Sequence, residues 1–136
     1  GLLLFTNDGE LANRIMHPAS HINKVYRVTV RPDITDEQAA ELSAGVKIGE
    51  NTTTLPATVI VLEKQPGRVV LQITISEGKN RQIRRMCEAL GYQVQTLKRV
   101  RMLNITLDGL KTGEYREVTA AERQKLEDIL NGKKND

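Results

Sequence analysis

The segment that decides the fold is Arg68-Val69-Val70-Leu71-Gln72-Ile73-Thr74-Ile75-Ser76, a run rich in β-branched residues. A second run of this kind, residues 57–63, precedes it, and Lys64-Gln65-Pro66-Gly67 separates the two. Proline and glycine between two such runs are typical of a hairpin turn, so the pair predicts a β-hairpin. The side chains that we expect on its core face are Leu71, Ile73 and Ile75.

A third strand is predicted at Lys24–Arg31, where side-chain character alternates and Pro32 follows. Successive side chains of a strand point to opposite faces of the sheet. One face should therefore carry Tyr26, Val28 and Val30. The other face should carry Arg27, Thr29 and Arg31.

Four helices are predicted around these strands. Asn7 or Asp8 can cap the first helix, which ends before Pro18. Capping boxes that begin at Thr35 and Thr119 predict two more, the first of them running to about Ser43. Asn80 is the expected cap of the fourth. Its predicted apolar face consists of Ile83, Met86, Cys87 and Leu90.

The remaining segments are predicted to be mainly extended. Residues 93–107 predict two strands with a break near Leu103-Asn104, and residues 115–118 predict a short strand. Residues 1–6 predict a buried strand. The fold class is therefore α+β, with a mostly antiparallel mixed sheet and flanking helices. We expect one domain unit over residues 1–131 and a flexible tail over 132–136.

The charge of the chain is balanced overall but concentrated locally. Among 136 residues the net charge is only +3, yet Glu88 is the only acid between Lys79 and Arg101. The basic residues of this stretch are Lys79, Arg81, Arg84, Arg85, Lys98, Arg99 and Arg101. Charge alone leaves two interpretations open, a solvated charged face and a nucleic-acid contact surface.

Several function classes are excluded by missing motifs. No glycine-rich nucleotide-binding loop is present. His17 and His21 have the spacing of a helical metal pair, but Pro18 interrupts that helix and no third ligand is evident, so no metal site is expected. One cysteine, Cys87, excludes an internal disulfide and indicates a reducing compartment, the cytoplasm. No apolar stretch is long enough for a membrane span.

Two candidate functional residues stand out. Arg84 lies on the border between the basic and apolar faces of its predicted helix, from which it can point into a cleft. The loop before that helix begins with Gly78 and offers free N–H groups to an anion. Tyr26 can pack in the core, which its spacing favours, or stack on an unstacked base.

Five blocks of the sequence stand out together, in their order and spacing: residues 1–9, 24–26, 77–86, 97–101 and 113–116. They resemble the RsuA-type pseudouridine synthases, bacterial enzymes that modify uridines in ribosomal RNA. The resemblance covers nearly the whole chain, and residues 85–88 and 101–104 are closer to the large-subunit, RluB/RluF-like branch.

The resemblance implies a function and roles for particular residues. The family flips a uridine out of the RNA and isomerises it without a cofactor or metal. Tyr26 matches the tyrosine that stacks on the base, and Arg84 matches the basic residue that pairs with the catalytic aspartate. Leu97 matches a hydrophobic residue of the pocket. The residues implied to contact the RNA are Lys79, Arg81, Arg85, Lys98, Arg99 and Arg101.

The catalytic aspartate of this family lies a few residues before the stretch that matches Gly1. Asp8 matches a turn of the family and is explained by helix capping. We therefore expect a truncated catalytic domain that is inactive alone. We also expect its exposed sheet edge to pair with the upstream segment or with a second copy. The alternative function is a non-catalytic RNA-binding module that uses the basic surface of residues 79–101.

Overall fold

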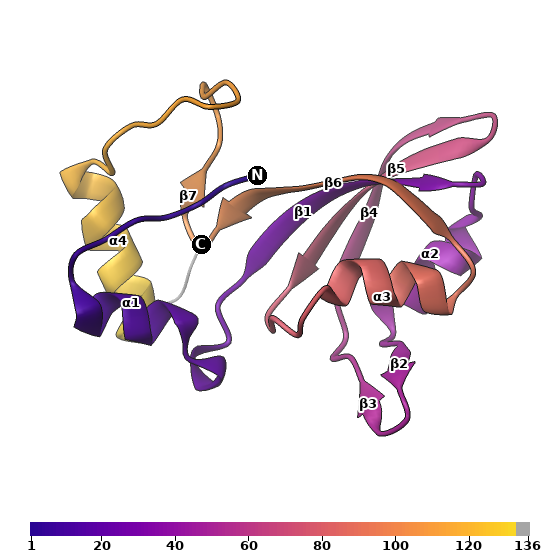
Figure 1. The fold of residues 1–136 in the computed structure, drawn as a ribbon, viewed down its shortest axis with the longest axis horizontal. Helices are drawn as coiled ribbons and strands as arrows, with labels where there is room; N and C mark the ends of the chain where they lie inside the picture. The colour runs from indigo at the N-terminus through magenta and orange to yellow at the C-terminus, as the bar shows by residue number, and fades with distance from the viewer. Residues whose placement is uncertain (133–136) are drawn as a thin grey trace.

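The structure, a computed structural model, describes residues 1–132 and contains one five-stranded sheet (Figure 1). The strands lie in the order β4-β5-β1-β6-β7, and neighbouring strands of this sheet are antiparallel. Their bounds are β1 Lys24–Arg31, β4 Thr58–Gln65, β5 Arg68–Ile75, β6 Gln93–Met102 and β7 Ile105–Thr106. A two-stranded ribbon of β2 Lys47–Gly49 and β3 Thr52–Thr53 stands apart from this sheet.

Four α-helices flank the sheet. They are α1 Gly9–Met16, α2 Asp36–Ser43, α3 Gln82–Ala89 and α4 Ala120–Leu130, and a 3₁₀ turn, Pro18–Ser20, follows α1. Figure 1 shows α2 and α3 on one half of the molecule and α1 and α4 on the other. The long strands β1 and β6 run between the two halves. The predicted α+β class is confirmed.

Strand β1 is the centre of the sheet, because β5 pairs with one side of it and β6 with the other. Val28 lies opposite Leu71 of β5 and Leu97 of β6. Val28 and Val30 are fully buried, as are Leu71 and Ile73 of β5. The alternation predicted for Lys24–Arg31 is therefore confirmed, with its apolar side chains inside.

Helices α2 and α3 close the main core over this face of the sheet. From α2 the core receives Ala39 and Leu42, and from α3 it receives Ile83, Met86 and Cys87. Both helices are amphipathic, so burial of one face stabilises them against the sheet. Strands, helices and the β2–β3 ribbon thus share one hydrophobic core.

A second, smaller core lies at the other end of β6. Leu2, Ile22 and Met102 are buried there together with Leu126 of α4. Leu11 and Ile15 of α1 pack against this cluster. Glu122 of α4 accepts two hydrogen bonds of 2.7 Å from the Arg116 guanidinium, which lowers its pKa to about 2.

Most of the predicted elements are confirmed. The hairpin of β4 and β5, the capping boxes at Thr35 and Thr119, and the N-cap at Asp8 are all present. The predicted break between β6 and β7 falls at Leu103, whose φ of 54° lies in the left-handed region.

The prediction of a buried strand over residues 1–6 is wrong. Leu2 is buried and donates its backbone N–H to the Arg99 carbonyl at 2.8 Å, but no strand forms there. Leu3 is 67% exposed and Phe5 is 87% exposed. Leu2 and Leu4 contact the second core, whereas Leu3 and Phe5 between and after them are exposed. An apolar composition alone therefore predicted more burial than this segment has.

Two further predictions are wrong. Residues 115–118 form no strand. They belong to the connection that leads into α4 and have no pairing partner in the described residues. Asn80 does not cap α3; Arg81 occupies the cap position with a φ of 52° and makes no side-chain capping bond. The predicted tail begins at Gly132, and residues 133–136 lie outside the described residues.

No helix within the described part of the chain is long and apolar enough to cross a membrane.

Substituting Leu71→Ala tests the central position of the main core. Leu71 is fully buried between β1 and β4, so its loss should lower the free energy of unfolding by about 2–5 kcal/mol. The exposed Leu3→Ala is the matched control and should change it by less than about 0.5 kcal/mol. Urea unfolding measures both, and equal losses would contradict this assignment of the core.

Candidate functional site

Tyr26 and Leu97 lie on the same face of the sheet, on neighbouring strands. Across the β1–β6 ladder Tyr26 pairs with Arg99, and Val28 pairs with Leu97. Both side chains are half-buried and pack against the rim of the main core. Part of the Tyr26 ring therefore packs in the core, while the rest of its surface stays open to solvent.

Arg84 lies on α3, the helix that covers this face. Its neighbours in the helix, Ile83 and Met86, are buried in the core that Tyr26 and Leu97 also contact. Arg84 itself is half-buried. Within the described residues its guanidinium has no hydrogen bond and no ion pair, so its charge is available to an anion at the border of the core.

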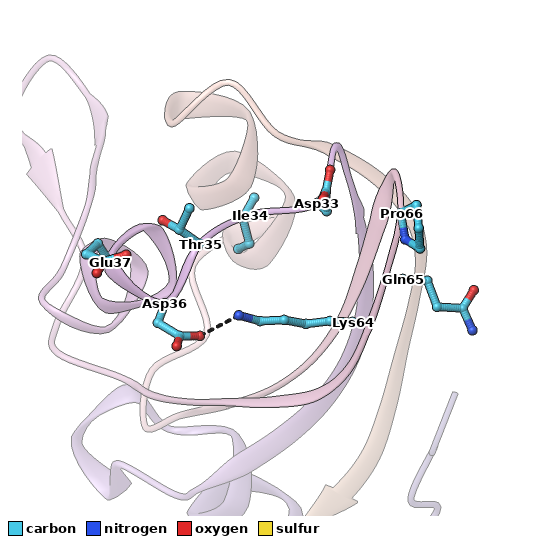
Figure 2. Close-up of a pocket in the computed structure, with 8 residues that line it drawn as sticks. All are labelled: Asp33, Ile34, Thr35, Asp36, Glu37, Lys64, Gln65 and Pro66. Carbon is cyan, nitrogen blue, oxygen red and sulfur yellow. Dashed lines mark hydrogen bonds and ion pairs between the residues drawn. The ribbon is translucent and has the colours of Figure 1, made fainter.

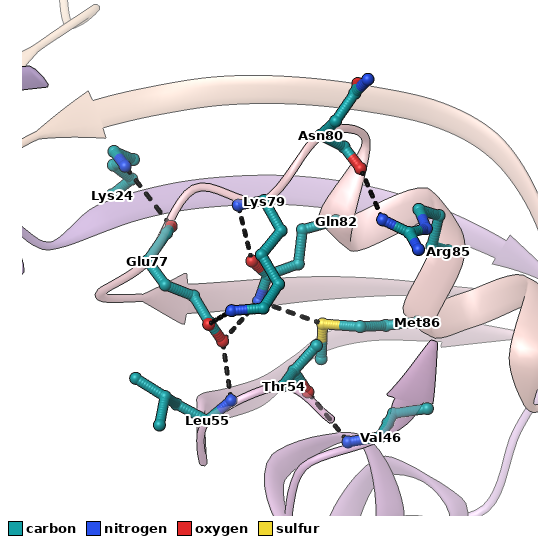
Figure 3. Close-up of polar contacts among 10 residues, drawn as sticks. All are labelled: Lys24, Val46, Thr54, Leu55, Glu77, Lys79, Asn80, Gln82, Arg85 and Met86. Atoms are coloured by element: carbon teal, nitrogen blue, oxygen red, sulfur yellow. Dashed lines mark hydrogen bonds and ion pairs between the residues drawn. The ribbon is translucent and has the colours of Figure 1, made fainter. Parts of the chain in front are cut away.

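The loop that leads into α3 is held by the carboxylate of Glu77 (Figure 3). One oxygen accepts hydrogen bonds from the backbone N–H of Leu55 at 2.7 Å and from the side-chain amide of Gln82 at 2.8 Å. The other accepts one from Lys79 Nζ at 2.6 Å. Gln82 in turn accepts the backbone N–H of Lys79 at 3.1 Å. These bonds replace the missing side-chain cap of α3.

The Glu77 side chain is only 10% exposed, so its charge depends on these donors. Burial alone would raise the pKa of the carboxyl, but the hydrogen bonds from Lys79, Leu55 and Gln82 outweigh burial and lower the pKa. Glu77 is therefore ionised at neutral pH. It connects the end of β5, the segment after β3 and the first turn of α3.

Lys24 lies two residues before Tyr26, on the same face of β1. Its Nζ donates to the Glu77 carbonyl at 3.3 Å, and a Cβ placed on Gly78 would lie only 2.7 Å from that Nζ. Partial burial and the nearby charge of Arg99 lower the pKa of Lys24. The sequence presented Lys24 only as part of a motif. Its partners come from the loop after β5 and from β6, and they could not be identified from the sequence.

The structure does not gather the predicted RNA-contacting residues on one surface. Arg85 donates to the Ile48 carbonyl at 3.0 Å and so holds β2 against α3. Arg99 donates to the Leu2 carbonyl at 2.7 Å, and Arg101 donates to the Leu103 carbonyl. Arg81 and Lys98 are exposed. Several of these cations therefore hold backbone segments in place.

Two other features of the fold stand apart from this site. Cys87 is fully buried, which raises the pKa of its thiol to about 12 and makes it a core residue. A cavity of about 600 Å³ lies between the start of α2 and the β4–β5 turn (Figure 2). Its charged groups include Asp33, Asp36 and Glu37, and Lys64 is paired with Asp36 at 2.8 Å. An acidic lining does not suit a polyanion.

Comparison with known proteins identifies the family. Residues 1–89 match the RNA pseudouridylate synthase family. The chain belongs to this family. The matched region includes Tyr26 and Arg84, so the resemblance inferred from the sequence blocks is confirmed.

Individual relatives agree with the family match. The chain is 41% identical to ribosomal large subunit pseudouridine synthase B of Bacillus subtilis, over 99% of this chain and 56% of that protein. It is 43% identical to the dual-specificity RNA pseudouridine synthase RluF of Escherichia coli, over 88% of this chain and 39% of that protein. A crystal structure of a pseudouridylate synthase superposes with a TM-score of 0.81 at 35% identity, covering 89% and 52% of the two chains.

The chain is therefore an RluB/RluF-like pseudouridine synthase sequence by similarity. It spans about half the length of the curated relatives that it matches. The Tyr26–Leu97 face and α3 lie within the part that is shared.

Substituting Glu77→Gln tests the carboxylate that holds α3. A neutral amide binds Lys79 less strongly and cannot accept from all three donors, so the free energy of unfolding should fall by about 1–3 kcal/mol at pH 7. Exposed Glu50→Gln is the matched control and should have little effect.

The loss should also depend on pH. Because folding lowers the pKa of Glu77 below its ordinary 4.5, its contribution is fully present above pH 4.5 and disappears as pH falls through the lowered value. Urea unfolding between pH 7 and pH 3 measures this. A gap between wild type and Glu77→Gln that stays constant over this range would contradict the assignment.

Proposed function

We propose that this chain is part of an enzyme that isomerises a specific uridine of ribosomal RNA, in the large subunit, to pseudouridine in the cytoplasm. The observation that carries the proposal is that Tyr26 and Leu97 pack against the main core, to which α3 contributes Ile83 and Met86, the helix neighbours of Arg84. An aromatic ring, an aliphatic side chain and an unpaired cation at the edge of an apolar layer suit a flipped base that reacts with a carboxylate.

The roles follow from the chemistry of each side chain. The exposed part of the Tyr26 ring would stack on the flipped uracil, and Leu97 would form the apolar wall beside it. An aspartate would form a bond to the nucleotide as the glycosidic bond to N1 breaks, and the detached uracil would rotate. Rejoining through C5 would break the bond to the aspartate, C5 would lose its proton, and N1 would gain one. Arg84 would pair with the aspartate and keep its pKa low, so that it stays ionised as the nucleophile.

We place that aspartate upstream of Gly1. The backbone of Gly1 lies directly against Arg99, and Arg99 is the cross-strand partner of Tyr26. Residues that precede Gly1 would therefore enter the structure at the edge of β6, next to the cross-strand partner of Tyr26, and Gly1 itself also lines a groove on the opposite face of the sheet. The 136-residue chain alone should be inactive, because Asp8 is engaged in capping α1 through the backbone N–H of Leu11 at 3.1 Å.

The outer edge of β6 is partly unpaired and can accept another strand. One side of β6 pairs with β1 along its length, whereas the other side meets Leu2 at Arg99 and β7 only at Arg101 and Met102. Residues 93–98 have no strand on that side within the described residues. We propose that the upstream segment pairs there, with a second copy of the chain as the alternative occupant.

The first experiment compares the chain with a version extended upstream through its native sequence. Pseudouridine formation is measured on a large-subunit ribosomal RNA fragment. Only the extended version should convert uridine, because only it carries the aspartate. Activity of the 136-residue chain alone would show that the nucleophile is misplaced. If both versions bind the RNA and neither reacts with any ribosomal fragment, the chain is a binding module.

A second experiment substitutes Arg84→Ala in the extended version. Without the cation the aspartate is less readily ionised and poorly positioned, so kcat should fall by about 100-fold or more. The RNA dissociation constant should change by less than about 10-fold, the scale of one surface charge. Arg84→Lys, which keeps the charge, should recover part of the activity.

Arg81→Ala is the control for that substitution, since Arg81 is three residues away and exposed. It should weaken RNA binding and leave kcat unchanged. An equal loss of kcat for Arg81→Ala and Arg84→Ala would contradict the role given to Arg84.

A further inference from the structure

Two cations face each other on the side of the sheet opposite to α2 and α3. Arg27 of β1 and Lys98 of β6 are directly paired across the ladder, so their side chains leave the same face at neighbouring positions. Both are exposed. Among the residues described, neither side chain has a hydrogen bond or an ion pair.

Like charges directly opposite each other destabilise a sheet. An acid within reach would relieve the repulsion, but the carboxylate on this face, Glu63, interacts with Arg68 at 3.7 Å. Arg68 also donates to the Gln65 side chain at 2.9 Å. The fold therefore retains an uncompensated pair of positive charges where neutral residues would pack with less repulsion.

These cations line a groove of about 500 Å³. Arg27, Arg68 and Lys98 supply its positive charge, and Glu63 is its acid. Its hydroxyl donors are Thr29, Thr96 and Thr112. Thr29 and Thr96 are paired across the same ladder, one step along from Arg27 and Lys98. Guanidinium, ammonium and hydroxyl donors on one concave face are the groups that bind phosphate oxygens in nucleic acids.

We propose that this groove binds the phosphodiester backbone of the RNA substrate, with Arg27 and Lys98 as its principal contacts. The proposal rests on the function proposed above and adds a binding surface to it. A merely solvated face explains exposed charges singly, but it does not explain a like-charge cross-strand pair with hydroxyls beside it. An anionic backbone supplies the compensating charge that the described residues lack.

The position of the groove restricts the form of the RNA. Arg27 follows Tyr26 in the same strand, so the two side chains point to opposite faces of the sheet. An RNA that contacts both Tyr26 and the groove must therefore be folded, so that it reaches both faces of the sheet. A short linear oligonucleotide that occupies the Tyr26 side would not reach the groove.

The test uses Arg27→Gln, Lys98→Gln and the double substitution, in the 136-residue chain and in the version extended upstream. The matched control is Lys47→Gln, an exposed lysine on the β2–β3 ribbon outside the groove. RNA binding is measured by fluorescence anisotropy at several salt concentrations, with a folded ribosomal stem-loop and with a short linear strand. Thermal unfolding is measured for every variant.

We expect each groove substitution to reduce the salt dependence of stem-loop binding by about 0.7–0.9 in the slope of log K against log salt, which is one phosphate contact. Binding of the linear strand should not change, and Lys47→Gln should affect neither RNA. Melting temperature should not fall, because a repulsion is removed. In the extended enzyme KM should rise while kcat at saturating RNA is retained.

Three results would overturn the proposal. Unchanged stem-loop binding would show that the groove has no RNA contact. A fall in melting temperature without loss of binding would show that the cations hold an acidic part of the protein. An equal effect of Lys47→Gln would show a general charge effect. These results are distinct from a failure of the proposed function. If the proposed function is wrong, the unsubstituted extended version will show no turnover, but the anisotropy measurements will still report whether the groove binds RNA.

Discussion

Strand β1 is the element on which the rest of the structure depends, because it is paired on both sides and its two faces meet different surroundings. Val28 and Val30 point into the main core and are fully buried. Arg27 and Thr29 point to the opposite face. The alternation of a β-strand thus places Tyr26 and a charged groove on two sides of one backbone.

Helix α3 depends on a second constraint, the buried carboxylate of Glu77. The helix lacks a side-chain cap, and its first turn is attached to the sheet through Glu77, Gln82 and Lys79. Arg85 adds a contact to the β2 backbone. A buried polar network is favourable only when its members are satisfied, so this one fixes a single orientation of the helix. The position of Arg84, a residue of this helix, depends on that orientation.

The basic side chains of the described residues therefore fall into two groups by their contacts. Arg85, Arg99 and Arg116 are occupied with carbonyl or carboxylate groups of the protein itself. Arg84, Arg27 and Lys98 have no such partner within the described residues. A count of basic residues along the sequence does not separate these groups, because the difference lies in which acceptors the fold brings within hydrogen-bonding distance.

The sequence by itself determined the long strands, most helix starts and the apolar faces. These depend on local periodicity and capping, which residues such as Thr35, Val28 and Thr119 express directly. It also determined the family, through motifs that include Tyr26 and Arg84. Tertiary structure decided the partial burial of residues 1–6, the left-handed cap at Arg81 and the Arg27–Lys98 pair. The first depends on a contact between Leu2 and Arg99, which are distant in sequence, and the last on strand register, so no local pattern encodes them.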